Sequence, residues 1–115
     1  MRTTLLIFVG VLTLGGCASV EVSETNYASA DEALADARAA GAEEYAGAAL
    51  TEAENKLEMA KNAIDDNDEE AAQRYVAEAK VSAELAQATA QSEKSQLAAN
   101  QVRESMRALQ NEMSR

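Results

Sequence analysis

The sequence predicts an all-α fold: an elongated antiparallel helical hairpin of two to three helices with a coiled-coil-like alanine seam. Alanine, the best helix former, occurs 26 times in 115 residues, while proline is absent and all five glycines lie at or before Gly47. Apolar residues recur at steps of three and four, which is typical of helices that pack along one another. Strand patterns are absent beyond a short "SVEV" that begins at Ser19.

The first element is an apolar run from Leu5 to Leu14, which follows the basic Arg2. Ten residues make a helix of about 15 Å, roughly half the thickness of a bilayer's hydrocarbon core. A short apolar segment between a basic start and small residues is typical of a secretory signal peptide, which we predict for residues 1–16. The alternative is a buried core helix.

The next four residues, Leu14, Gly15, Gly16 and Cys17, resemble the lipobox of bacterial lipoproteins. The resemblance implies cleavage before Cys17, a diacylglycerol thioether on its sulfur and acylation of the new amine, so that the protein is held in a membrane by lipid. Cys17 is the only cysteine, so a disulfide within the chain is excluded, and an incidental small residue is the remaining alternative. In lipoproteins, aspartate directly after the modified cysteine favours retention in the inner membrane. Ala18 occupies that position here, so the resemblance implies that the protein is held at the periplasmic face of the outer membrane.

Residues 17–28, "CASVEVSETNYA", are polar and lack helical periodicity, so we predict a flexible tether there. Ser29 and Glu32 have the spacing of a capping box, which predicts that the helical domain spans residues 29–115. One face of its first helix carries Ala30, Leu34 and Ala37.

Two heptad seams joined by the polar turn "DDNDEE" (65–70) predict the antiparallel hairpin. We expect Asn67 to cap the second helix, with Glu70 completing a capping box. The acidic turn superficially resembles a calcium loop, but it lacks the glycine and the distant glutamate of an EF-hand, so no metal site is expected. The first seam comprises Ala46, Leu50, Ala53, Leu57, Ala60 and Ile64; the second comprises Ala72, Val76, Ala79, Ala83, Ala86 and Ala90.

Beyond Ala90 the apolar phase changes, and a helix from Asp68 to Met113 would be about 68 Å long. Its last two or three turns would project beyond the hairpin unless the segment from Ser29 covers them. We expect an association stripe here, for a second copy or an envelope partner, or else a fold-back onto the first helix. The stripe comprises Ala99, Val102, Met106, Leu109 and Met113.

Composition also bounds the function. The net charge is −10, which argues against a nucleic-acid partner. No histidine is present, so a Ser-His-Asp triad cannot form, and we expect no catalytic residue, cofactor or small-molecule substrate. Tyr27, Tyr45 and Tyr75 are expected to anchor helix interfaces, and stacking on the sugars of a glycan is the alternative.

The segment "ADARAAGAEEYAGAALTEAENKLEMA" is similar to a bacterial envelope family known as domain of unknown function 4398, whose members are short alanine-rich helical lipoproteins or exported proteins. The similarity covers about Ala30 to Ala99, and Gly47 departs from it because proline is common there. The predicted lipid anchor, tether and helical seams together lead us to expect a non-enzymatic structural or adaptor module, anchored to the outer membrane through Cys17. The alternative function is non-covalent binding of peptidoglycan or another glycan. The matching residues are Gly41, Ala42, Tyr45, Ala46, Leu50, Ala53, Leu57 and Ala60, then the ladder Ala72, Ala79, Ala83, Ala86 and Ala90.

Overall fold

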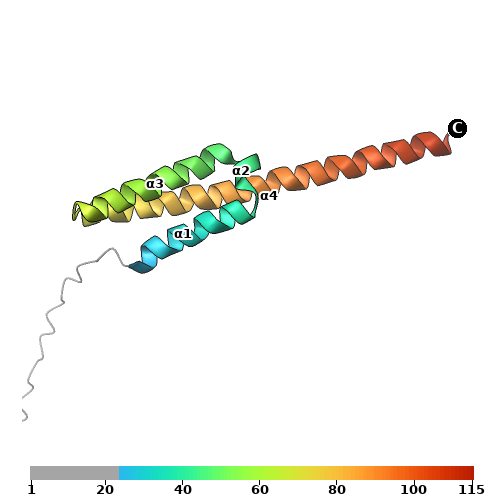
Figure 1. Ribbon diagram of the computed structural model, residues 1–115. Coiled ribbons are helices and arrows are strands. Elements are labelled where there is room, and N and C mark those ends of the chain that lie inside the picture. The colour runs from blue at the N-terminus through green and yellow to red at the C-terminus, as the bar shows by residue number, and fades with distance from the viewer. Residues whose placement is uncertain (1–23) are drawn as a thin grey trace, which may run out of the picture.

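The computed structural model describes residues 24–115, and these residues form four helices without a strand. They are α1 (Glu24–Ala39), the single turn α2 (Ala42–Tyr45), α3 (Gly47–Asp65) and the long α4 (Glu69–Met113). The predicted all-α, elongated fold is confirmed (Figure 1). At 45 residues α4 is about 67 Å long, more than twice the length of α3.

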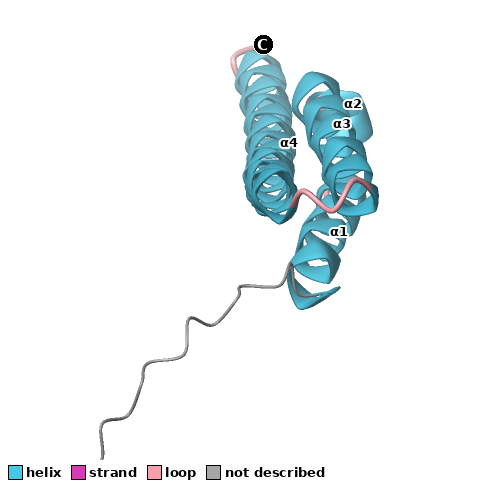
Figure 2. Ribbon diagram, turned by 90° about the vertical axis from the view of Figure 1, so that its left-hand side faces the viewer, coloured by secondary structure: helices cyan, strands magenta, loops and turns pink. Residues whose placement is uncertain are grey.

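The three long helices run up, down and up along one another (Figures 1 and 2). The hairpin of α3 and α4 is antiparallel, and an ion pair between Lys56 of α3 and Glu78 of α4 links the two helices. Helix α1 is antiparallel to α3, and an ion pair between Arg38 of α1 and Glu54 of α3 links these two helices. Helix α1 therefore runs parallel to α4. The start of α1 consequently lies at the end of the bundle that holds the α3–α4 turn.

The core between these helices is built mostly from alanine, as the heptad seams predict. All three residues expected on the first helix face are buried, as are all six of the second seam. Only Leu34, Leu50, Leu57 and Val76 add larger buried side chains, so the helices approach closely. Two clusters form along the bundle, one around Leu34 and Leu50, the other around Leu57 and Val76.

The phase slip in "GAEEYAG" is a break between α1 and α3. Gly41 adopts a φ of 90°, in the left-handed region that favours glycine, and so turns the chain out of α1. Helix α2 follows for one turn, and Ala46, with φ −146°, redirects the chain into α3. Ala42 and Ala46 are buried on either side of this turn, which explains why apolar residues continue through the break.

The predicted start of the helical domain is wrong. Helix α1 begins at Glu24 rather than Ser29, and Ser29 lies inside it with its hydroxyl donating to the carbonyl of Asn26 at 2.8 Å. A serine inside a helix bonds back to the preceding turn in this way instead of capping an amide. Residues 24–28 therefore belong to the helix and not to a tether; residues 17–23 lie outside the described part of the chain.

The predicted cap of α4 at Asn67 is also wrong, because this residue belongs to the motif that terminates α3. Asn67 has a φ of 57°, and its amide donates to the carbonyl of Ile64 while that of Asp68 donates to the carbonyl of Ala63. These bonds form a Schellman motif, in which asparagine tolerates the left-handed conformation. Asp68 then caps α4, accepting the amide of Ala71 at 3.0 Å.

The last position of the first seam is shifted by one residue. Ala63 is buried, whereas Ile64 is 42% exposed. The reason is that Ile64 lies in the last turn of α3, where the chain leaves the interface for the turn, so the smaller Ala63 faces α4. The other five predicted residues of this seam are buried as expected.

Candidate interaction surface

The predicted lipobox, Leu14 to Cys17, and the predicted signal peptide at residues 1–16 lie outside the described residues. No helix between Glu24 and Arg115 combines the length and the apolar character needed to cross a bilayer. Candidate sites in the structure are therefore sought on the three-helix bundle and on the segment that follows it.

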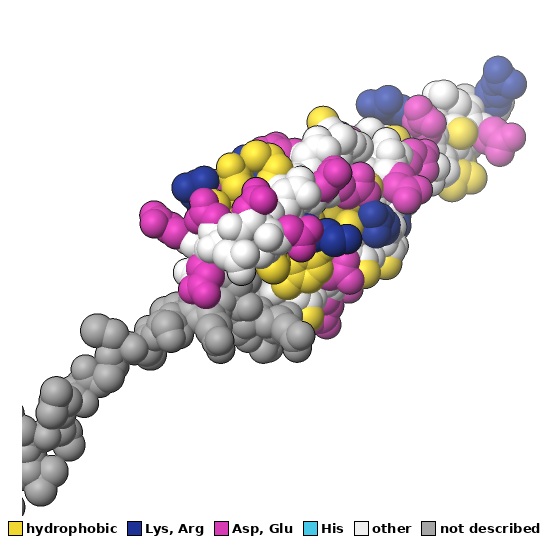
Figure 3. Space-filling model, turned by 60° about the vertical axis from the view of Figure 1, so that its left-hand side comes forward, with side chains coloured by type: hydrophobic (Ala, Val, Ile, Leu, Met, Phe, Trp, Pro, Cys, Tyr) yellow, Lys and Arg dark blue, Asp and Glu magenta, His cyan; other side chains and the backbone are white. Residues whose placement is uncertain are grey.

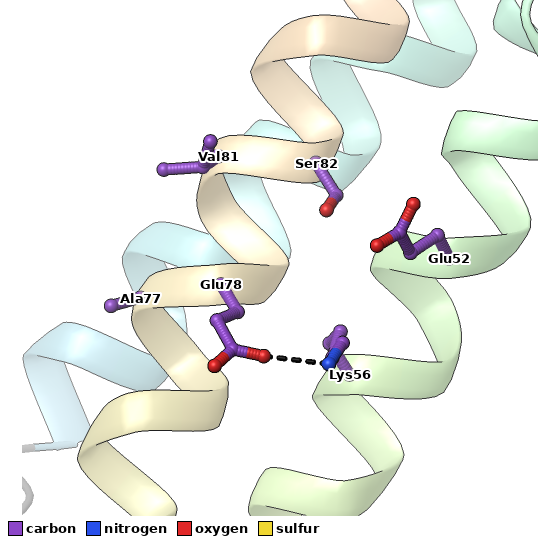
Figure 4. Close-up of a pocket in the computed structure, with 6 residues that line it drawn as sticks. All are labelled: Glu52, Lys56, Ala77, Glu78, Val81 and Ser82. Atoms are coloured by element: carbon purple, nitrogen blue, oxygen red, sulfur yellow. Dashed lines mark ion pairs between the residues drawn. The ribbon is translucent and has the colours of Figure 1, made fainter.

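A shallow hollow lies between α3 and α4 and is bordered by Glu52, Lys56, Glu78, Val81 and Ser82 (Figure 4). The Lys56 ammonium bonds the Glu78 carboxylate at 2.6 Å, and this hydrogen bond raises the pKa of Lys56. The ion pair links α3 to α4 across the hollow. We read the hollow as part of the helix interface.

The acidic turn between α3 and α4 serves the backbone. The Asp68 carboxylate accepts an amide of the first turn of α4, where Glu69 and Glu70 also lie close to the positive end of the helix dipole. Within residues 24–115, no group of three carboxylates or thiols is placed to hold a metal ion.

The tyrosines pack against the core. Tyr27 and Tyr75 border the cluster around Leu57, and Tyr45 borders the one around Leu34. The guanidinium of Arg74 lies 4.9 Å from the centre of the Tyr75 ring. The rings thus line helix interfaces, as expected, and their faces are partly covered by neighbouring side chains.

The end of α4, from Gln91 onwards, is uncovered and extends past α1 and α3 as a single helix (Figure 1). We call Gln91–Met113 the projecting segment. Every residue in it is exposed, and the predicted association stripe is open to solvent: Val102 is 59% exposed, Met106 57%, Leu109 60% and Met113 84%. The expected alternative, a fold-back onto the first helix, is therefore wrong, and the projection is about six turns rather than two or three.

The sequence explains why the bundle ends near Ala90. Continued in register, the buried seam of α4 would next use Glu93, Leu97, Asn100, Glu104, Arg107 and Asn111. Only Leu97 in this set is apolar, so another helix would gain little by packing there. At the edge of this region, the Lys94 ammonium donates to the carbonyl of Ala40, the residue after α1, at 3.3 Å.

Two exposed apolar residues of α4 lie within the bundle and were not anticipated. Val81 is 64% exposed and Leu85 57% exposed, on the side of α4 opposite the buried seam. Val81 points away from α3 in Figure 4. Their positions could have been predicted from the sequence, because apolar or small residues also recur at steps of three and four on the outer side of α4, as they do in the buried seams. The space-filling view shows apolar side chains among charged ones on the surface (Figure 3).

Comparison with known proteins identifies one family. The model of a domain of unknown function, DUF4398, matches residues 25–102, which include α1, α2, α3 and the first part of α4. No match was found among curated proteins or among solved structures. Because the match covers well over half of the 115 residues, the chain belongs to the DUF4398 family.

Proposed function

We propose that this protein is an outer-membrane-anchored lipoprotein that serves as a non-enzymatic structural or adaptor module in the bacterial envelope. The observation that carries the adaptor role is the projecting segment, an uncovered helix with an apolar stripe. Exposed apolar stripes of this kind mark association surfaces. The anchor is proposed from the sequence of Leu14 to Cys17.

The geometry fits these two roles together. Helix α1 starts at the end of the bundle that holds the α3–α4 turn, whereas the chain ends at the tip of the projecting segment (Figure 1). A lipid attached upstream of α1 would therefore act at one end of the rod, and the association stripe at the other. Such a rod would present its stripe away from the membrane surface.

A glycan-binding function has weaker support. It requires open aromatic faces, and all three tyrosines are partly buried against the core clusters. We therefore keep it as a competing outcome of the experiment on sacculi described below.

The anchor is tested by expressing the full chain and its Cys17→Ser variant in a double-membraned bacterium and separating the membranes on a density gradient. We expect the parent chain to incorporate a palmitate analogue and to sediment with the outer membrane. The variant should remain unprocessed and unlabelled. Labelling of the variant, or parent protein in the inner membrane, would contradict the anchor or the address.

The adaptor role is tested with a photo-crosslinking residue at Met106, in the stripe, and at Glu104 on the other side of the same turn. We expect a discrete protein adduct from position 106 and none from position 104. Incubation with purified sacculi separates the alternative, because retention of the chain is expected only of a glycan binder. Retention without a position-specific protein adduct would favour the glycan function over the adaptor.

A further inference from the structure

The outer side of α4 carries a second heptad seam, which we call the outer seam. It runs without interruption from Val81 to Met113, with steps of four and three that alternate throughout. Every position is apolar or small, and every one is exposed. Over this range the seam is about 48 Å long. Its members are Val81, Leu85, Ala88, Ser92, Ser95, Ala99, Val102, Met106, Leu109 and Met113.

We propose that the outer seam pairs two copies of this chain in a parallel, in-register, two-stranded coiled coil. The inference deepens the proposed function, since it names a second copy as the partner of the projecting segment. The pairing itself does not depend on the proposed anchor. The anchor serves only as a supporting argument for the parallel orientation.

The length and period of the seam define the occupant. A strict repeat of seven residues over nearly five heptads is the pattern of a helix in a supercoiled coiled coil. The occupant of the seam is therefore another helix of similar length. Among the described helices only α4 itself is long enough, since α1 has 16 residues and α3 has 19. Both shorter helices already pack on the opposite side of α4, and no residue of the outer seam belongs to either core cluster.

The two serines at the centre of the seam each make a hydrogen bond within their own helix. The Ser95 hydroxyl donates to the carbonyl of Gln91 at 2.8 Å, and the Ser92 hydroxyl accepts from the amide of Gln96 at 3.3 Å. Each serine oxygen therefore retains one hydrogen bond within its own helix when the seam is covered. The small residues at this centre allow close approach, while Val81, Leu85 and the last four seam residues supply larger contacts at the two ends.

The flanking charges favour the parallel orientation. In register, Glu84 of one copy would lie beside Thr89 of the other and Ala98 beside Arg103, so no like charges meet. A fully overlapping antiparallel pair would instead place Glu84 opposite Glu112 at both ends of the interface. Like charges across an interface are unfavourable.

Parallel pairing also agrees with the course of the chain. It places both α1 helices at the same end of the assembly, because α1 and α4 run in one direction. Two chains anchored to one membrane surface need this arrangement.

Disulfide trapping tests both the pairing and its direction. The full chain is prepared with Cys17→Ser and with one new cysteine, either Val102→Cys or, as the matched control, Glu104→Cys on the opposite side of the helix. Both proteins are purified in a nonionic detergent. We expect Val102→Cys to form dimers roughly tenfold faster or more, because pairing raises the effective concentration of its thiols. Equal rates at the two positions would overturn the proposal.

A mixed experiment tests the direction separately. In the antiparallel arrangement Ser92 of one copy would oppose Val102 of the other, whereas the parallel one pairs each residue with itself. Ser92→Cys and Val102→Cys chains of different tag length are therefore mixed and oxidised. Predominant self-pairing supports the parallel coil, and predominant mixed dimers overturn it.

Sedimentation of the same Cys17→Ser protein gives an independent readout. We expect a concentration-dependent dimer that Leu109→Asp weakens by tenfold or more and that Asn111→Asp leaves unchanged. Both sites are exposed, so circular dichroism should show a folded bundle in each variant. A parent chain that stays monomeric at high concentration would overturn the pairing. None of these outcomes depends on lipid, so failure here leaves the proposed anchor to its own experiment.

Discussion

The side chain of Leu57 should carry a large share of the stability of the bundle. It is 8% exposed and lies in the cluster with Ala30, Ala60, Val76 and Ala79, among which it is the largest side chain. Replacement by alanine removes three carbon atoms, worth roughly 2.4 kcal/mol of transfer free energy at about 0.8 kcal/mol per buried methylene. The cavity that remains raises the expected loss to about 2.5–4 kcal/mol.

This loss is measured as the change in free energy of unfolding in urea, followed by circular dichroism. A small domain has a total stability of about 5–15 kcal/mol, so Leu57→Ala should remove roughly a sixth of it or more. Leu97→Ala is the matched control: Leu97 is 46% exposed in the projecting segment and should change the free energy by less than about 0.5 kcal/mol. Leu57→Asp, which buries an unpaired charge, should unfold the protein. Equal losses at positions 57 and 97 would refute the assigned core.

Three further predictions concern the helix ends and one ion pair. Asp68→Ala should cost about 1 kcal/mol of unfolding free energy, because an amide in the first turn of α4 loses its acceptor; no loss would remove Asp68 from the cap. Gly41→Ala should destabilise the protein by about 1 kcal/mol, whereas Gly47→Ala, with open space around its Cβ, should be neutral or slightly stabilising in the same titration. Because Glu78 raises the folded-state pKa of Lys56, this pair's contribution is complete below about pH 10.4 and is lost as the pH rises through the folded-state pKa. Melting curves should show that Lys56→Gln loses less stability than the parent between neutral and strongly alkaline pH, and parallel curves would contradict this.

The helices and their buried faces could be predicted from the sequence, because alanine-rich heptads leave one face to bury. The ends of the helices could not be placed as well. Ser29 and Asn67 both have the residue type of a cap, but a serine also fits inside a helix and an asparagine also fits a left-handed helix end. Which role wins depends on where the neighbouring helix stops, and this is a tertiary property.

The interaction surface was predicted in part. Val102 to Met113 stand out because their side chains are large and no other segment has a matching face. The continuation to Val81 is harder to see, because Ala88, Ser92, Ser95 and Ala99 resemble the small residues found everywhere in α4. Knowing which face of α4 is buried separates the two seams, and the structure supplies that face.

The projecting segment has a consequence for how the protein responds to heat. An isolated helix must overcome an unfavourable nucleation step, but the bundle already fixes the turns from which this segment grows. Each further residue needs only favourable propagation, and no glycine or proline interrupts Gln91–Met113. Unlike the cooperative bundle, the uncovered projecting segment would therefore lose helical structure gradually as the temperature rises. Its helical length is a graded quantity, set by temperature and by whatever covers it.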